Sequence, residues 1–437
     1  MRRIAGSQQP ARGVATRGRN ALVIIFRNVD VMSLRPSSFG FTLLIAALAA
    51  LPPLSIDMSL PATDRIGTAL QAPPAQTGLT LSLFMVGFAL AQLVFGPLSD
   101  RFGRRVLLIV ACALFAASGF FCAFAGGIET LLAWRFVEGA GAGGATVLAF
   151  AMVRDLFEGA EAGARMATIS AVMTAAPMLA PSIGAFILRF ADWRAIFLVL
   201  AVAGAALVLV VTLQLAESHR APDPTALEIR RLARSYARAL THRTSLGHAL
   251  LGALSFGCLF AFVSGSPFVF IGVLGLSAGW FALLFATCAL GLTAGSLICG
   301  RLIKLGANPR RLLTAGVFAQ AAFSLALLAM ALLGVFEVWD ALPFLVLNNV
   351  AMGVVSPLAV HGAVEPFPDM AGVASAVRGC VQMLGGAAAS ALVAALFAGT
   401  PTALPLAMSV FAVASCLTWR LLLPRAISET KPRAASA

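Results

Sequence analysis

The chain has 437 residues, of which 60% are hydrophobic and 11% are charged. Its mean hydropathy of +0.93 excludes an ordinary soluble protein, and its length leaves room for about twelve membrane spans of twenty residues. The net charge of +13 does not indicate a nucleic-acid partner, because the basic residues lie almost entirely in segments that join apolar runs.

Twelve apolar runs, each long enough to cross a bilayer as a helix, follow one another along the chain. The runs lie near 39–61, 78–98, 106–127, 131–153, 165–189, 193–215, 247–270, 280–303, 311–335, 342–362, 372–397 and 402–423. If the chain begins in the cytoplasm, the only Lys and Arg residues away from the cytoplasmic side are Arg65, Arg135, Arg189 and Arg194. The positive-inside rule therefore predicts that both termini are cytoplasmic.

Polar segments divide these runs into two groups of six. The predicted units are a basic tail at 1–38, six spans at 39–215, a cytoplasmic linker at 216–246, six spans at 247–423 and a tail at 424–437. A basic segment that begins with Gly300 and Arg301 follows the eighth run. It is similar to the turn that begins with Gly96 and follows the second run. Such an internal repeat is consistent with two halves related by duplication.

The N-terminal tail contains no run that could span a membrane. Its apolar patch at 21–26 is too short to cross a bilayer. A cleavable signal peptide is not expected, because the first long apolar run begins only at Phe39 and lacks a small-residue cleavage site. The tail is therefore either a cytoplasmic extension or precedes the true start, for which Met32 is the alternative to Met1.

A compact charged turn between the second and third runs is the most informative motif. Residues 96–105 read GPLSDRFGRR, in which two glycines permit tight turns and one acid faces a basic cluster. This decapeptide resembles the G-x-x-x-D-R-x-G-R-R loop of the major facilitator superfamily of membrane transporters. A generic positive loop is the alternative explanation. The candidate gate residues are Gly96, Asp100, Arg101, Gly103 and Arg104.

Further blocks resemble the bicyclomycin-resistance (Bcr/CflA) family, a branch of the drug:proton antiporters. Residues 55–62 read SIDMSLPA, close to S-x-D-M-Y-L-P-A, and residues 135–139 read RFVEG where R-F-x-Q-G is usual. Residues 176–184 read APMLAPSIG, similar to the antiporter element G-P-x-x-G-G, and residues 264–270 read SGSPFVF. The resemblance spans both groups of six and implies twelve transmembrane helices in two six-helix bundles.

Three ionisable residues inside predicted spans need an explanation, because a charge in lipid is costly unless it is paired or faces water. Asp57 comes late in an outward span and Arg135 early in an inward one. We therefore expect both in the outer part of the membrane, where they could meet across one cavity and couple transport to protons. Glu138 follows Arg135 by three residues, within reach of an ion pair. Either Asp57 or Glu138 could be the carboxyl group that couples transport to protons. A static pair that only fixes helix packing is the alternative for these residues.

The resemblance implies roles for the turn and for the fifth span. Asp100 is expected to cap the N-terminus of the eleventh helix near Gly372, with the neighbouring arginines supporting a closed cytoplasmic side. Prolines bend helices because each removes a backbone donor, and a bend would assist alternating access. The candidate antiporter-helix residues are Pro177, Pro181 and Gly184.

A substrate pocket is expected between the halves. Its candidate residues are Phe260, Phe268 and Gln382, of which the aromatics suit varied apolar molecules, although contact with lipid is the commoner role of Phe in a span. The seven cysteines fall inside apolar runs without metal-like spacing, so neither a metal site nor a cofactor is expected.

Together these features predict a proton-coupled exporter of small drug-like molecules in the bacterial inner membrane, acting as a monomer by alternating access. An exporter or importer of a natural metabolite, such as a sugar or an amino acid, is the alternative. An enzyme is not expected, because the sequence contains no recognisable nucleophile with a base, no metal-ligand cluster and no phosphate loop. The expected partners are the small-molecule substrate, protons and the lipid bilayer.

Overall fold

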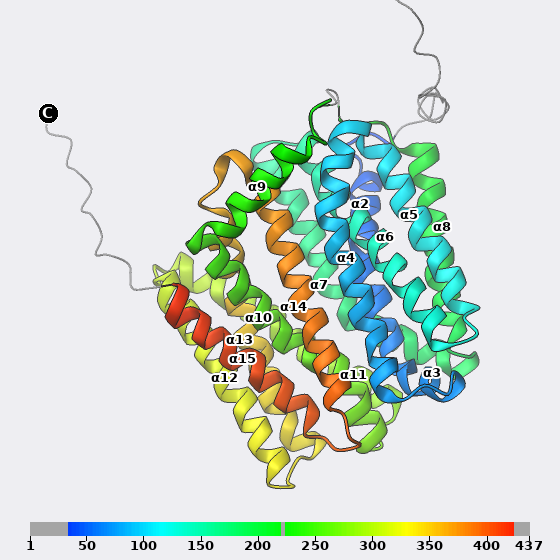
Figure 1. Cartoon of the computed structure of the whole chain (residues 1–437), viewed down its shortest axis with the longest axis vertical. Coiled ribbons are helices and arrows are strands. Elements are labelled where there is room, and N and C mark those ends of the chain that lie inside the picture. The colour runs from blue at the N-terminus through cyan, green and yellow to red at the C-terminus, as the bar shows by residue number, and fades with distance from the viewer. Residues whose placement is uncertain (1–33, 220–222, 424–437) are drawn as a thin grey trace, which may run out of the picture.

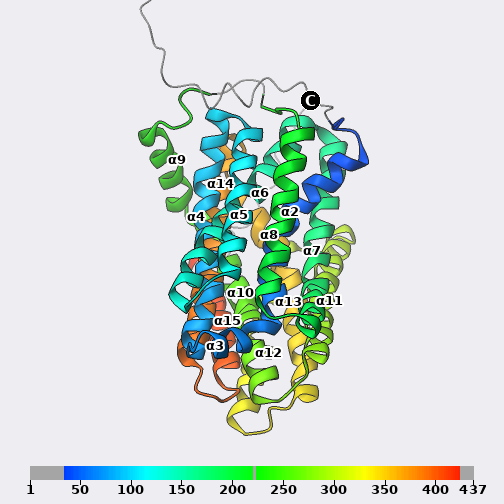
Figure 2. The same cartoon turned by 90° about the vertical axis from the view of Figure 1, so that its right-hand side faces the viewer.

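The computed structural model describes residues 34–219 and 223–423. Within these ranges every regular element is a helix, and twelve helices are long and apolar enough to cross a membrane. Figures 1 and 2 show them side by side in one elongated bundle. The predicted all-α membrane fold is confirmed. The two candidate start residues and the C-terminal tail at 424–437 lie outside the described residues.

The first six spans form what we call the N-half. They are α2 (Phe39–Ser59), which continues through η1 (Leu60–Ala62) and α3 (Thr63–Ala69), then α4 (Pro74–Phe102), α5 (Arg104–Ala123), α6 (Ile128–Leu156), α7 (Gly159–Phe190) and α8 (Arg194–Gln214). Several of these helices extend beyond the predicted apolar runs, because backbone hydrogen bonding continues into polar sequence that hydropathy does not detect.

The last six spans form the C-half. They are α10 (Arg243–Ser266), which continues as the π-helix η2 (Pro267–Val273), then α11 (Ala278–Lys304), α12 (Pro309–Leu332), α13 (Val338–Val364), α14 (Ala371–Leu396), preceded by the short η3 (Pro368–Met370), and α15 (Ala403–Leu422). Their starts follow local sequence signals. Ser277 and Asn308 accept backbone N–H groups at the first turns of α11 and α12, as expected for N-cap residues.

Close backbone contacts hold α4 between α6 and α14. A Cβ atom added at Gly87 would lie 2.0 Å from the Phe136 carbonyl oxygen, and one at Gly139 would lie 1.9 Å from that of Phe84. Small residues permit such approaches between membrane helices. On its other side α4 packs along α14 of the C-half, as Figure 1 shows.

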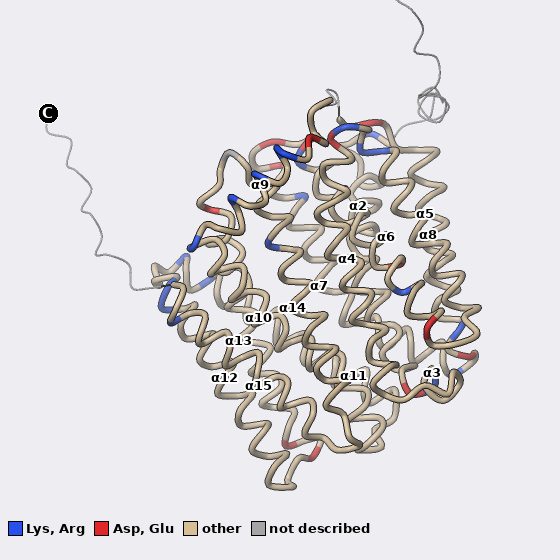
Figure 3. Tube along the Cα trace, in the orientation of Figure 1, with Lys and Arg blue, Asp and Glu red and all other residues tan. Residues whose placement is uncertain are grey.

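Most Lys and Arg residues of the described chain lie at one end of the bundle (Figure 3). We call this the basic end; it carries the turn between α4 and α5 and the helix α9 (Ile229–Thr241). The polar linker predicted between the halves thus contains a helix. The helix α3 lies at the end of the bundle opposite the basic end (Figure 1).

The helix α9 joins the two halves at the basic end. Tyr236 donates from its hydroxyl to the Leu93 carbonyl of α4 at 2.8 Å, and Ala239 packs with Phe367 and Val377 of the C-half. Burial raises the pKa of Tyr236, which keeps the phenol protonated as a donor. Asp223, in the linker before α9, donates its backbone N–H to the Asp100 carbonyl at 2.9 Å.

Candidate functional site

A cavity of about 280 Å³ lies between the two halves. Helices α2, α4 and α7 line it from the N-half, and α10, α11, α13 and α14 line it from the C-half. Most of its wall is aromatic or aliphatic, and its polar side chains are Asp57, Asn349 and Gln382. We call it the central cavity. An apolar pocket with a few polar groups is typical of small-molecule sites.

Asp57 is the acidic residue of the central cavity. It lies near the end of α2 and only 4% of its surface is exposed. Within the part of the chain that the structure describes, no hydrogen bond or ion pair reaches its carboxylate. A buried carboxyl group without a partner is costly when ionised. Asp57 is therefore suited to exchanging a proton or to binding a cationic or hydrogen-bond-donating ligand.

Two amide side chains complete the polar part of this wall. Asn349 donates from Nδ2 to the Leu345 carbonyl at 2.8 Å, which leaves its Oδ1 available as an acceptor. Gln382 accepts from Arg378 Nη1 through its Oε1, which leaves its NH₂ group as a donor. Sequence reasoning identified Gln382 but missed Asn349, whose only signal was an Asn pair inside an apolar run.

Helix α7 contributes Pro177 to the central cavity. The helix runs from Gly159 to Phe190 without a break through Pro177 and Pro181. Gly184 lies two turns after Pro177, and a Cβ atom there would be 2.1 Å from the Met58 carbonyl oxygen. The absence of a side chain at Gly184 therefore allows α7 to contact the turn of α2 that carries Asp57.

Arg135 and Glu138 form the ion pair that their spacing predicts. Arg135 donates from Nη1 to Glu138 Oε2 and to Ser55 Oγ, both at 2.8 Å, and Ser55 donates to Glu138 Oε1 at 2.8 Å. Both charged side chains are buried, at 1% and 0% exposure. Cys122 donates from Sγ to Glu138 Oε2 at 3.8 Å. Glu138 is thus a fully partnered carboxylate within the N-half.

The expectation that Asp57 and Arg135 meet across one cavity is wrong. Arg135 does not line the central cavity. Its guanidinium lies 4.6 Å from the ring centroid of Phe84, and Phe84 forms part of the cavity wall. The ring therefore stands between the ion pair and the space that Asp57 faces.

The C-half contains a neutral counterpart of this buried network. Ser255 of α10 donates to Gln320 Oε1 at 2.5 Å, and Gln320 Nε2 donates back to the Ser255 carbonyl at 3.1 Å. Asn348 of α13 donates to the Gln320 carbonyl and to Ser324 Oγ. All four side chains are buried. Asn349, the next residue, lines the central cavity, so this network fixes the part of α13 that faces the site.

The residues predicted to contact the substrate lie in two different places. Phe260 and Gln382 line the central cavity together with Asp57. Phe268 does not line it: this residue lies in η2, where its ring packs 5.3 Å from that of Phe397. The residues of α10 that line the central cavity all lie between Phe256 and Val263, so Phe268 lies beyond the cavity along the helix axis.

The turn at 96–105 forms a charged cluster at the basic end. Arg104 pairs with Asp100 at 2.6 Å and with Asp155 at 2.9 Å. Glu217, which sequence reasoning missed, accepts the backbone N–H groups of Arg104 and Arg105 at 2.9 and 3.1 Å. It thereby caps the first turn of α5, where a carboxylate is favourable.

Two glycines and one further arginine belong to the same turn. Gly103 adopts φ +98° between α4 and α5, a conformation that favours glycine. Gly96 lines a cavity of about 510 Å³ between α4, α6, α9 and α14. Arg101 donates to the Pro224 carbonyl and so ties the turn to the linker.

The expectation that Asp100 caps the eleventh span is wrong. Asp100 lines the same 510 Å³ cavity as Ala371 and Gly372. The first turn of α14 nevertheless has no side-chain cap. Arg104, the first residue of α5, forms an ion pair with the Asp100 carboxylate instead.

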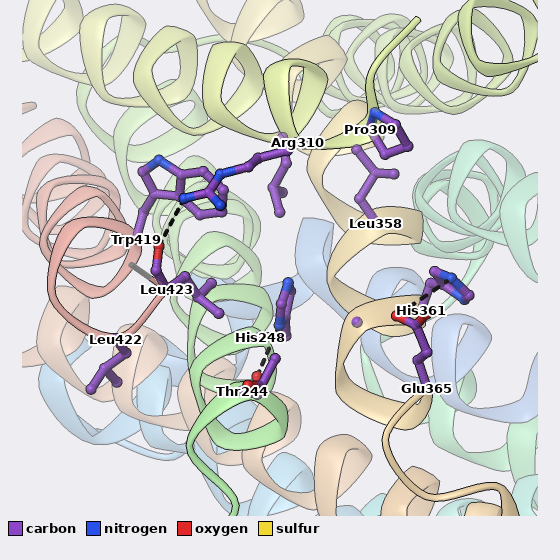
Figure 4. Close-up of a pocket in the computed structure, with 12 residues that line it drawn as sticks. Thr244, His248, Pro309, Arg310, Leu358, His361, Glu365, Trp419, Leu422 and Leu423 are labelled. Atoms are coloured by element: carbon purple, nitrogen blue, oxygen red, sulfur yellow. Dashed lines mark hydrogen bonds and ion pairs between the residues drawn. The ribbon is translucent and has the colours of Figure 1, made fainter. Parts of the chain in front are cut away.

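A separate cavity of about 420 Å³ lies within the C-half. Figure 4 shows Arg310 beside Trp419, His248 bonded to Thr244, and His361 next to Glu365 around it. Helices α10, α12, α13 and α15 provide its walls, and none of the predicted site residues lines it. We therefore place the candidate site in the central cavity.

Comparisons with known proteins agree with this architecture. The sequence matches the model of the Major Facilitator Superfamily over residues 37–390. It is 30% identical over 395 residues to a bicyclomycin resistance protein homolog of Haemophilus influenzae, covering 90% of this chain and 98% of that one. It is 31% identical over 348 residues to the multidrug resistance protein MdtL of Shigella dysenteriae, covering 78% and 84% of the two chains. The crystal structure of a D-xylose-proton symporter superposes with a TM-score of 0.69 at 17% identity, covering 88% of this chain and 98% of that one.

Proposed function

Because the chain belongs to the major facilitator superfamily of membrane transporters and to its bicyclomycin-resistance family, we propose that it exports small drug-like molecules in exchange for protons. The observation that carries this proposal is Asp57, a buried acid on the central cavity that has no partner among the described residues. In this mechanism Asp57 is ionised when it binds the substrate and neutral when it carries the proton.

The surroundings of the two buried acids favour Asp57 over Glu138 as the proton carrier. Protonation of Glu138 would disrupt its bonds with Arg135 and Ser55 and leave a buried guanidinium without its counter-ion. Protonation of Asp57 breaks no bond within the described chain and removes an isolated charge from an apolar wall. Only the second event is inexpensive enough to occur in every transport cycle.

The lining of the central cavity supports an apolar substrate. Three polar side chains among many aromatic and aliphatic ones suit a flat or irregular apolar molecule with few hydrogen-bonding groups. A sugar would leave most of its hydroxyl groups without partners there. The relatives named for resistance to bicyclomycin and to multiple drugs support export of drug-like molecules over a natural metabolite.

The location of the site between two halves supports alternating access. Helices α4 and α7 of the N-half pack against α14 and α11 of the C-half, so relative rotation of the halves would expose the central cavity to each side in turn. We propose that the basic end faces the cytoplasm of a bacterial inner membrane, with both termini on that side, because basic residues are retained there. We propose a monomer as the transporting unit, since one chain encloses the whole cavity.

Drug susceptibility in a bacterial host that lacks its own exporters tests this function. We expect the wild-type chain to confer resistance to several apolar drugs and an uncoupler to abolish it. Asp57→Asn, which keeps the shape but cannot titrate, should lose the resistance at normal expression. Asp64→Asn, an exposed acid on α3 outside the cavity, is the matched control and should retain it. Resistance that persists in Asp57→Asn, or that survives the uncoupler, would contradict the proposal.

A further inference from the structure

A small cavity lies beside Arg135, away from the central cavity. Its volume is about 20 Å³. The N-half contributes α2, η1, α3, α4, α6 and α8 to its wall, and the C-half contributes Ser264 of α10 and Phe268 of η2. Since α3 marks the end opposite the basic end (Figure 1), the cavity lies where the two halves meet on that side.

Arg135 brings an unused donor to this cavity. Its Nη1 donates to Glu138 and Ser55, whereas its Nη2 is buried and has no hydrogen-bond partner among the described residues. The whole side chain is 1% exposed. An unpaired N–H of a buried guanidinium carries a substantial desolvation cost. The cavity therefore contains a strong donor that lacks an acceptor.

The other polar side chains of the cavity present acceptors. The hydroxyl groups of Ser59, Thr63 and Ser264 each donate their hydrogen at 2.8 Å to a backbone carbonyl three or four residues earlier in the chain. The hydroxyl groups of Thr77 and Thr80 donate in the same way, at 3.2 and 2.7 Å. Every hydroxyl oxygen on the wall thus has lone pairs but no hydrogen left for the cavity.

We propose that this cavity holds one ordered water molecule. The water accepts from Arg135 Nη2 and donates its two hydrogens to hydroxyl oxygens on the wall, one of them Ser264 Oγ. A cavity of about 20 Å³ accommodates a single water and no larger ligand. A bound anion would face the lone pairs of the hydroxyl oxygens, and a bound cation would face the guanidinium. Water alone matches both the donor and the acceptors.

The water would join the two halves through a polar chain. The chain runs from Glu138 to Arg135, through the water, to Ser264 of the C-half. Separation of the halves at this end would remove Ser264 from the water, so closure at this end includes a hydrogen bond that an entirely apolar contact would lack. This inference does not depend on Asp57 or on the direction of transport, and its test is independent of transport activity.

Hydroxyl-radical footprinting by X-ray radiolysis of the full chain in detergent micelles tests for the water, because radiolysis of a bound water forms radicals in place that oxidise the side chains next to it. Phe197 lines the cavity and is 2% exposed, whereas Phe115 is 0% exposed and lies outside it. We expect Phe197 to be oxidised several-fold faster than Phe115. Equal oxidation of the two rings would overturn the proposal.

Two variants of α10 make the test specific. Ser264→Val removes the acceptor and fills the space of the water, so oxidation of Phe197 should fall to the rate of Phe115. Ser266→Ala is the matched control, since Ser266 is buried two residues further along and bonds only to its own helix; it should leave Phe197 oxidation unchanged. If folded Ser264→Val shows wild-type oxidation of Phe197, the radicals come from another source and the proposal fails. If Ser264→Val does not fold, the comparison of Phe197 with Phe115 in the wild-type chain decides alone.

Discussion

The N-half contains two buried acids whose surroundings differ at the level of single bonds. Glu138 accepts from Arg135 and Ser55, whereas Asp57 faces the central cavity without a partner among the described residues. We propose that the same side-chain chemistry provides a fixed structural charge at Glu138 and an exchangeable proton at Asp57. Residue type alone did not distinguish these roles; the distinction depends on which neighbours each carboxyl group contacts.

Removing one member of the Arg135–Glu138 pair should destabilise the protein strongly. We expect Arg135→Met to cost about 3–5 kcal/mol, because it leaves a buried carboxylate without its counter-ion. The double variant Arg135→Met/Glu138→Leu should recover most of that loss, since it removes both charges. Thermal unfolding in detergent micelles measures the stabilities of the wild type, the single variant and the double variant. A single variant as stable as the wild type would show that the pair is solvated rather than buried.

At the scale of elements, the contact between α2 and α7 depends on a missing side chain. A Cβ atom at residue 184 would collide with the Met58 carbonyl, so Gly184→Ala should force α7 away from the turn that carries Asp57. We expect a loss of stability of about 1–3 kcal/mol and a lower rate of transport. Gly163→Ala, on the same helix with no atom within 4 Å, is the control and should behave as wild type. Normal thermal unfolding and transport by Gly184→Ala would mean that this contact does not position Asp57.

The docking of α9 gives a second prediction at this scale. Tyr236→Phe removes the hydrogen bond to the Leu93 carbonyl, worth about 0.5–1.5 kcal/mol, while the ring remains packed. We expect faster hydrogen exchange in the amides of α9, with the spans unaffected. Thr241→Val, at an exposed position of the same helix, should leave the exchange unchanged. If Tyr236→Phe exchanges like the wild type, apolar packing alone holds α9 in place.

The sequence predicted the spans and the membrane class well, because hydropathy and length directly determine which segments can cross a bilayer. It predicted less about contacts between helices. The Phe84 ring separates Arg135 from Asp57, and Phe268 lies beyond the stretch of α10 that lines the central cavity. Both facts depend on how the helices are placed in three dimensions. The helix α9 did leave a signal, since Leu232, Tyr236 and Ala239 follow a helical period within an otherwise basic segment.

At the scale of the whole molecule, the two halves combine similar architecture with different chemistry. Each contains a buried polar network on equivalent helices, ionic around Arg135 in the N-half and neutral around Gln320 in the C-half. Only the N-half places a carboxyl group on the central cavity among the described residues. We infer that the N-half carries the proton site, while the C-half contributes mainly shape and amide groups to the substrate site.

The most direct measurement is proton release by purified protein when a drug binds, followed with a pH-sensitive dye in weakly buffered detergent solution. Binding of a drug to the central cavity should displace the proton from Asp57, so the wild-type chain and the Asp64→Asn control should both release protons. Asp57→Asn should release none while remaining folded. Release of the same number of protons by Asp57→Asn would contradict the account and move the proton site to another group.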